Sequence, residues 1–314
     1  MKKIDYRYLF SMRSRLIINL EADFVRDLSA LFTPLSVRSR LIYFCLIALS
    51  RFRCVNTNFP VADTRDFKDF GSAFAGHTVK CIYTGRYGKG NTYTFLTETG
   101  DESWITKVFP KDKSSAAYKE LISKDYAASY PVCIKDFNFR ILVSEVCSEG
   151  DNVMLRSVFH KKSGPIFSDE DYSRVSAFLK CVSQEDCDRS IKLNDLVNEL
   201  GGNFSNYFSK VPDSLKSEDI SLSLQHGDLA PWNVKKLLCG GLLLLDWEEA
   251  GFLPKYFDFV YFELRKNKIV FDFENLQSGI RDTLKQFSLD DQNREALVVS
   301  HLYILAQKGF IHVH

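Results

Sequence analysis

The sequence lacks the cysteine pattern with which proteins most often bind zinc. Its eight cysteines include no Cys-x-x-Cys pair, which argues against a zinc site of the usual spacing. Several of them stand inside apolar stretches, such as Cys45 in IYFCLIAL and Cys147 in LVSEVC, where buried, reduced thiols are typical. We therefore expect a cytoplasmic protein in a reducing compartment.

Long apolar runs are missing as well. The most apolar run, LIYFCLIAL at residues 41–49, has nine residues, whereas a helix that spans a membrane needs about 20. It begins only at residue 41, which does not fit a secretory signal. No internal repeat or low-complexity segment is visible. We expect neither a membrane span nor a secreted protein.

The chain as a whole has no excess of charge of one sign. Its 41 Lys and Arg residues face 40 Asp and Glu residues, so nothing in the net charge indicates nucleic-acid binding. Residues 1–53 are different, with ten basic and four acidic residues and a local charge of +6. Apolar residues recur there every four positions on both sides of Pro34, which is typical of helices. We predict that residues 1–62 form a basic, apolar helical extension and a linker.

Two interpretations of this extension stay open. The apolar run between Arg40 and Arg51 suits a helix that lies on an anionic membrane surface, which would place the protein at the inner face of the membrane. In the other interpretation, the extension is a helical pair packed on the strand-rich part of the protein. Apolar helix faces are most often buried against protein in this way.

Residues 63–146 are rich in short strands. Three segments with Thr, Val, Ile and aromatic residues are separated by turns that contain glycine: 78–85, 91–98 and 103–110. This pattern is typical of an antiparallel meander. Residues 114–129 are predicted to form a helix, and residues 135–147 one or two more strands. A chain of 314 residues is long enough for about two domains, and the first is expected to be a five-stranded sheet with one helix.

Residues 147–314 are predicted to be mostly helical. The helical pattern is found in four segments: 168–182, 193–204, 274–287 and 290–309. Ser168 and Asp171 resemble a capping box at the start of the first of them. Two short strands within residues 222–248 interrupt these helices. The fold class is therefore α+β, with a small sheet lobe followed by a larger helical lobe.

Polar residues are concentrated in LQHGDLAPWNV (224–234), and again where a run of leucines ends in DWEEAG (246–251). These segments could be polar turns between buried strands. Phosphoryl transfer offers another explanation, because it needs a carboxylate that orients the attacking hydroxyl and accepts its proton, together with oxygen ligands for Mg²⁺. Asp228, Asn233 and Asp246 supply these groups. We expect them to converge on a metal ion and a phosphate.

The motif His-x-Asp-x-x-x-x-Asn, followed by Asp-Trp-Glu, resembles the aminoglycoside phosphotransferase and choline kinase family. The resemblance covers roughly residues 78–310 and implies the two-lobed protein-kinase-like fold in its small-molecule kinase branch. It makes Asp228 the catalytic base and Asn233 and Asp246 the metal ligands. His226 would brace the loop, and two further acids would support the site: Asp258, matching the family's later buried Asp, and Glu248, the next metal ligand to consider.

The same resemblance places ATP in the strand-rich lobe. Lys107, on the third strand of the meander, would contact the phosphates and pair with Glu120 of the following helix; Lys119 and Lys124 are competing partners of Glu120. The turn with Gly85, Gly88 and Gly90 would cover the phosphates, although its glycine order differs from that of protein kinases. Residues 145–149 would form the hinge that meets adenine, including Glu145 and Cys147.

The expected function is ATP-dependent transfer of the γ-phosphate to a hydroxyl of a small molecule, with ATP and Mg²⁺ as cofactors. The acids and aromatic residues within 168–220 do not identify the acceptor. Variants of HGDxAPWN are similar to those of kinases associated with bacterial surface sugars, which makes a sugar hydroxyl the first expectation. The alternatives are a kinase-like binding module without catalysis, and a protein kinase. His-Gly-Asp in place of His-Arg-Asp speaks against the protein kinase.

Overall fold

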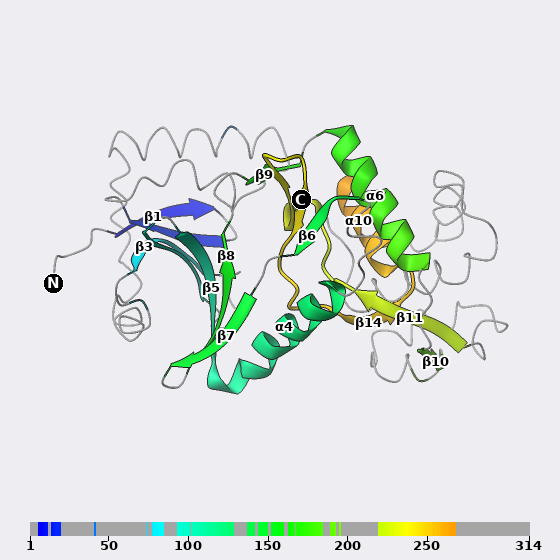
Figure 1. The fold of residues 1–314 in the computed structure, drawn as a ribbon, viewed down its shortest axis with the longest axis horizontal. Coiled ribbons are helices and arrows are strands. Elements are labelled where there is room, and N and C mark those ends of the chain that lie inside the picture. The colour runs from blue at the N-terminus through cyan, green and yellow to red at the C-terminus, as the bar shows by residue number, and fades with distance from the viewer. Residues whose placement is uncertain are drawn as a thin grey trace. The chain divides into compact units, whose positions relative to one another are not determined.

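A computed structural model describes the elements that carry these motifs (Figure 1). The described residues are 6–11, 14–19, 41, 74, 77–84, 93–100, 102–128, 137–141, 144–149, 152–159, 163–166, 168–184, 189–192, 195 and 219–267. The chain divides into two compact units. Unit 1 consists of residues 1–126, 138–166 and 234–248, and unit 2 of residues 127–137, 167–233 and 249–314.

The main element of unit 1 is a seven-stranded sheet with the order β1-β2-β3-β4-β5-β8-β7, in which all neighbours are antiparallel. Its strands are β1 (Tyr6–Ser11), β2 (Ser14–Asn19), β3 (Thr78–Thr84), β4 (Tyr93–Thr99), β5 (Glu102–Pro110), β7 (Ser144–Glu149) and β8 (Asn152–Val158). The predicted meander is confirmed as β3-β4-β5. The 3-10 turn η1 (Lys111–Lys113) and the predicted helix, α4 (Ser114–Ala128), follow it.

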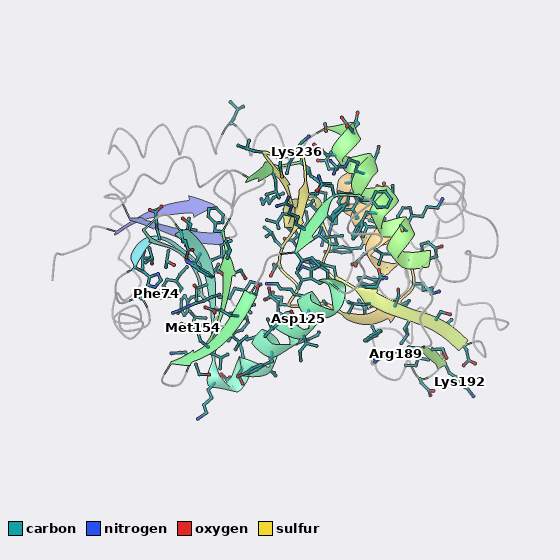
Figure 2. The ribbon with its side chains drawn as sticks, viewed as in Figure 1. Phe74, Asp125, Met154, Arg189, Lys192 and Lys236 are labelled. Carbon is teal, nitrogen blue, oxygen red and sulfur yellow. The ribbon has the colours of Figure 1, made fainter. Side chains whose placement is uncertain are left out.

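Two layers of apolar side chains cover the two faces of this sheet. On one face, Phe109, Val153 and Leu155 pack with Ala117 of α4. On the other face, Phe95, Val108 and Met154 pack around Phe74 (Figure 2). Adjacent residues of β8, Met154 and Leu155, point to opposite faces, as the alternation of a strand requires.

The prediction of a five-stranded sheet, followed from residue 147 by a mostly helical part, is wrong at β8. This strand lies between β5 and β7 in the seven-stranded sheet, with Lys107 opposite Leu155. In β8, Val153 and Leu155 face one apolar layer, and Met154 faces the other. The strand is therefore apolar on both sides, and its sequence shows no simple alternation. The predicted strand region 135–147 is divided, because β6 (Phe139–Ile141) belongs to another sheet.

The prediction of a helical N-terminal extension is wrong for the residues of β1 and β2. These two strands form a hairpin, and β2 pairs with β3 from Arg15–Thr84 to Ile18–Cys81. The segments YRYLFS and SRLIIN are rich in aromatic and β-branched residues, which favour strands, and this composition outweighs the four-residue spacing. Leu41 is helical and exposed; the rest of the predicted extension lies outside the described residues.

The pairing of β2 with β3 supports the interpretation in which the N-terminal segment packs on the strand-rich part. The membrane contact has no support in the structure. Within the described ranges, no helix is long and apolar enough to cross a membrane.

Removing residues 1–60 should therefore destabilise unit 1, because the edge of β3 loses its partner strand. We expect the unfolding midpoint to fall by at least about 5 °C, since a change of 1 kcal/mol shifts it by roughly 2–4 °C in a protein of this size class. Thermal unfolding followed by circular dichroism measures the effect. A truncated chain that unfolds like the full chain, combined with salt-sensitive binding of the full chain to anionic vesicles, would contradict this prediction and restore the membrane interpretation.

Unit 1 contains a second, four-stranded sheet with the order β6-β13-β12-β9. The strands β12 (Val234–Leu237) and β13 (Leu242–Leu244) form a hairpin that is flanked by β9 (Ser163–Pro165) and, in parallel, by β6. All three leucines of β13 are buried, which fixes the strand that leads to Asp246.

The described part of unit 2 contains two helices, three strands and a 3-10 turn. The elements are α6 (Asp169–Gln184), β10 (Ser190–Lys192), β11 (Asp219–Gln225), the 3-10 turn η2 (Pro231–Asn233), β14 (Gly251–Pro254) and α10 (Phe257–Asn267). The strands form a sheet with the order β10-β11-β14. The capping pair of α6 is confirmed: the Ser168 hydroxyl accepts the Asp171 N–H at 3.1 Å and donates to its carboxylate at 2.7 Å.

The strands of the motif region and the helices of the C-terminal part differ in places from the predictions. The region 222–248 was expected to contain two strands, but β11, β12 and β13 all fall within or overlap it, because the motif lies between two separate strand pairings. Helix α10 was not predicted. Helix α6 matches its predicted segment, whereas the predicted helices at 193–204, 274–287 and 290–309 lie outside the described residues apart from the helical Asp195.

Candidate active site

The loop that carries the His-Gly-Asp motif, residues 226–230 and here called the HGD loop, is held by the first turn of α10. The buried Asp258 carboxylate accepts the backbone N–H of His226 and, at 2.9 Å, that of Gly227. In return, the Asp258 N–H donates to the Gln225 side chain at 3.0 Å. Burial raises the pKa of Asp258, although these N–H groups and the charge of His226 oppose the change. The hydrogen bonds therefore fix the backbone immediately before Asp228.

Gly227 is the residue of this loop that has to be glycine. Its φ is +80°, in the left-handed region. A Cβ atom at this position would overlap the backbone carbonyl of Glu249. The arginine that protein kinases carry between their histidine and aspartate does not fit this backbone.

Replacing Gly227 with alanine is expected to destabilise the protein more than the same change at Gly240. Gly240 has a similar φ of +79° but open space around its Cβ position, so it measures the cost of backbone strain alone, about 1 kcal/mol. The overlap at Gly227 should add roughly 1–3 kcal/mol. Urea unfolding of the two variants provides the comparison, and equal losses would show that the loop moves away from Glu249 without cost.

Asp228, at the end of the braced segment, is half-buried, and its partners include Tyr261 and Asn233. The hydroxyl of Tyr261 donates to its Oδ1 atom at 2.6 Å. The amide of Asn233 donates to its backbone oxygen at 2.8 Å and lies 3.4 Å from its Oδ2 atom. The structure thus brings Asp228 and Asn233 together within unit 2, with the Asn233 amide bonded to the loop.

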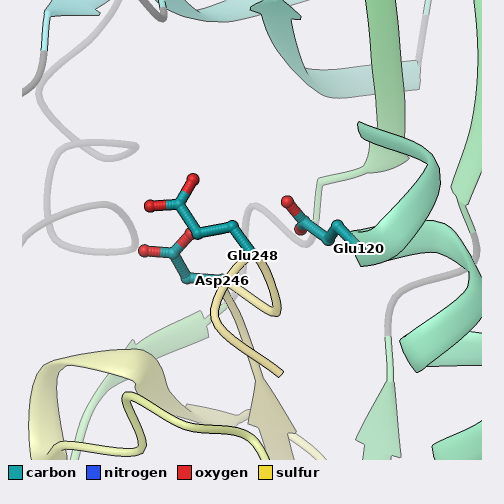
Figure 3. Close-up of side chains that lie close together, drawn as sticks. All are labelled: Glu120, Asp246 and Glu248. Atoms are coloured by element: carbon teal, nitrogen blue, oxygen red, sulfur yellow. The ribbon is translucent and has the colours of Figure 1, made fainter. Parts of the chain in front are cut away.

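The counterpart in unit 1 is a lysine surrounded by three carboxylates. The Lys107 ammonium on β5 donates to Glu120 of α4 at 2.9 Å and to Asp246, and it lies 3.7 Å from Glu248. One oxygen of each acid lies within 4.8 Å of the others (Figure 3). Burial opposes the charge of Lys107, but attraction by Asp246, Glu120 and Glu248 raises its pKa above the usual range. Lys107 is therefore a permanent cation.

Glu120 has two lysine partners rather than one. Its second carboxylate oxygen accepts from Lys124, one helical turn away, at 3.0 Å. Lys124 is buried and also contacts Ser144 and Ser157 at 3.0 and 3.3 Å. Burial opposes the charge of Glu120, but the two lysines lower its pKa. Burial lowers the pKa of Lys124. Lys107 and Lys124 thus share Glu120, while the third candidate, Lys119, is exposed.

Asp246 leaves the buried strand β13 with an unusual backbone. Its φ is +65°, a conformation that Asp and Asn adopt more easily than most residues. About two fifths of the side chains of Asp246 and Glu248 are exposed, whereas Glu120 is buried. Carboxylate oxygens are the ligands that Mg²⁺ prefers, so the two exposed acids fit a divalent cation that arrives from solvent.

The remaining candidates are not brought to Lys107. Glu145 is exposed, and Cys147 packs against the Phe74 cluster with Met154. Lys107 lies opposite Leu155, whose side chain is on the α4 face of the sheet. Cys147 and Lys107 therefore occupy opposite faces. The glycines 85, 88 and 90 lie outside the described residues.

Tyr261 and Arg265 were not among the predicted site residues. Both follow Asp258 on α10 at helical spacing, i+3 and i+7, and so lie on the same face of the helix. A signal was present in the sequence, because the polar residues of FDFVYFELRKN recur at this spacing. This spacing brings the polar residues to one face only if the segment is a helix.

Comparisons of this chain with known proteins gave matches among solved structures and not among family models or curated sequences. Solved structures similar to it include an aminoglycoside 3′-phosphotransferase of type VIII, with 13% identity, 75% of this chain and 96% of that chain covered, and a TM-score of 0.47.

Two others have comparable values. A thermostable aminoglycoside phosphotransferase mutant with ADP and hygromycin B has 13% identity, coverage of 77% and 90%, and a TM-score of 0.48. A choline kinase from Streptococcus pneumoniae has 15% identity, coverage of 78% and 97%, and a TM-score of 0.43. Such a likeness concerns the fold alone, and the function has to be inferred from the residues of this chain.

Proposed function

We propose that this protein is an ATP-dependent phosphotransferase that moves the γ-phosphoryl group of ATP to a hydroxyl group of a small molecule. The observation that carries the proposal is the environment of Lys107, which contacts Glu120, Asp246 and Glu248. A fixed cation next to solvent-accessible carboxylates is the combination that binding a metal-bound triphosphate needs.

The proposed nucleotide residues lie in unit 1, apart from Asn233, which lies in unit 2. Lys107 would donate to the α- and β-phosphates, held by Glu120. Asp246, together with Asn233, would be a metal ligand, and Glu248 would support them. The metal ion would neutralise negative charge on the phosphates. These roles are supported by the ion pairs of Lys107 with Asp246 and Glu248 and by the exposure of both carboxylates.

The proposed chemical step uses Asp228. The acceptor oxygen attacks the γ-phosphorus, and the bond from that phosphorus to the bridging oxygen of ADP breaks. The proton of the acceptor hydroxyl passes to the Asp228 carboxylate, so that ADP leaves with the bridging electrons and the product is a phosphate monoester. The HGD loop holds Asp228 for this purpose through its bonds to Asp258.

The acceptor proposed first is a sugar, on the resemblance of HGDLAPWN to kinases associated with bacterial surface sugars. A panel of sugars, aminoglycosides, choline and ethanolamine, assayed for ADP release with ATP and Mg²⁺, tests the proposal. We expect one class to stimulate ADP release well above the rate without acceptor. The same preparation of an Asp228→Asn variant corrects for contaminating ATPases.

Three outcomes are distinguishable. Stimulation by one class supports the kinase and identifies its acceptor. Binding of the nucleotide without turnover on any acceptor would favour the kinase-like binding module. Absence of nucleotide binding, measured by calorimetry with and without Mg²⁺, would contradict the proposal altogether.

A further inference from the structure

Helix α10 contacts the HGD loop at a second point, the carboxylate of Asp228 itself. Tyr261 is almost fully buried, and its hydroxyl donates to the Oδ1 atom of Asp228 at 2.6 Å. Phe257, one turn earlier, stacks on the tyrosine ring with a centroid distance of 6.1 Å and an interplanar angle of 13°. The phenol is therefore fixed in position as well as bonded.

Arg265 determines the direction of this hydrogen bond. Its Nη2 atom donates to the Tyr261 hydroxyl at 2.9 Å. A guanidinium group can only donate, so the tyrosine oxygen accepts there and its single proton is left for Asp228. Burial, followed by the nearby Asp228 carboxylate, raises the pKa of Tyr261 above its usual range. The phenol therefore keeps its proton at any working pH.

Arg265 is itself held by aromatic rings. Its guanidinium carbon lies 5.4 Å from the ring centre of Trp232, in the turn η2, and 5.0 Å from that of Tyr261. It has no acidic partner among the residues that the structure describes, and its Nε atom is buried without a hydrogen bond there. The cation is therefore linked to Asp228 through Tyr261.

We propose that Tyr261 and Arg265 are positioning residues that orient the Asp228 carboxylate for its role as the catalytic base. This inference rests on the proposed function. The phenol donates to the Oδ1 atom at 2.6 Å, and the Asn233 amide lies 3.4 Å from Oδ2 and donates to the backbone oxygen of Asp228 at 2.8 Å. Trp232 contacts Arg265, and its neighbour Asn233 contacts Asp228, so these two residues of η2 adjoin this network.

The first test is Tyr261→Phe, which removes one hydroxyl and keeps the ring. We expect kcat for ADP release, with the acceptor identified from the panel, to fall at least about tenfold, while KM for MgATP stays unchanged. Arg265→Met should lower kcat less, because it leaves the phenol in place. Tyr118→Phe makes the same chemical change at an exposed position of α4 and should change neither constant. An unchanged kcat in Tyr261→Phe overturns the proposal.

A double-mutant comparison separates positioning from a general structural role. If Tyr261 acts through Asp228, adding Tyr261→Phe to Asp228→Asn should have almost no further effect on the residual rate, measured in a single turnover with labelled ATP. A residue that only supports the fold would lower the rate by the same factor in both backgrounds. Equal factors would therefore overturn the proposal.

A spectroscopic readout tests the contact without any activity. In protein with ¹³C-labelled aspartate carboxyl groups, the Asp228 resonance is identified by its loss in Asp228→Asn. It should shift in Tyr261→Phe and stay in place in Tyr118→Phe. A resonance that does not move contradicts the proposal, whereas a shift in a protein that turns over no acceptor would leave the contact established and reject the proposed function.

Discussion

Replacing Asp228 with asparagine is expected to lower phosphoryl transfer by at least about a hundredfold, the scale of general-base catalysis. An asparagine side chain has nearly the same shape and can still accept the Tyr261 hydrogen bond, so the HGD loop keeps its geometry. It lacks the basic oxygen that takes the hydroxyl proton. Because Lys107, Glu120 and Asp246 are on other segments, affinity for MgATP should stay nearly unchanged.

The measurement combines steady-state kinetics with calorimetry on the same preparation. Asp219→Asn is the matched control, because Asp219 is an exposed aspartate at the start of β11 in the same unit. It should retain full activity. A rate for Asp228→Asn within a few fold of the parent protein, with the thermal unfolding midpoint preserved, would remove Asp228 from the chemical step.

The second large effect is expected at Asp246. Asp246→Ala and Asp246→Asn should both weaken binding of MgATP, by at least about tenfold, because a hydrogen bond or ligand contact of a charged group contributes on the order of 1.5–3 kcal/mol. Asparagine tolerates the φ of +65°, whereas alanine is strained there. If both variants lose affinity, the loss comes from the missing carboxylate and not from the backbone.

Binding of ATP without metal should change in the opposite direction or not at all. Asp246 also holds the Lys107 ammonium, and its removal leaves that cation freer to contact phosphates. Calorimetry in the presence of Mg²⁺ and of a chelator separates the two effects. Asp125→Ala, at an exposed carboxylate of α4 (Figure 2), serves as the control. Unchanged affinity for MgATP would direct attention to Glu248 as the metal ligand.

Local sequence was sufficient for much of the fold and for the choice of candidate residues. The strands β3, β4 and β5 and the helix α4 could be predicted because alternation and helical spacing are local properties. The acids and amide of HGDLAPWN and DWE, with Lys107, stand out because several polar groups of one chemistry occur at fixed spacing. Their roles in catalysis stay predictions.

What could not be predicted depends on contacts between distant segments. Strand β8 is apolar on both faces, so its periodicity is weak and only its partner strands decide its conformation. Tyr261 is 33 residues from Asp228, and Lys124 meets Ser157 across an equal separation. Helical spacing places Tyr261 near Asp258 but does not state which loop the helix contacts.

The small sheet of unit 1 has a consequence for synthesis of the chain on the ribosome. Strand β6 pairs in parallel with β13, and β9 pairs with β12, so residues 139–165 obtain these neighbours only from residues 234–244. At roughly 5–20 residues per second, several seconds pass between synthesis of β6 and β9 and synthesis of their partner strands, β12 and β13. A nascent chain that ends before residue 234 cannot complete this sheet, and such chains should be clients of ribosome-associated chaperones.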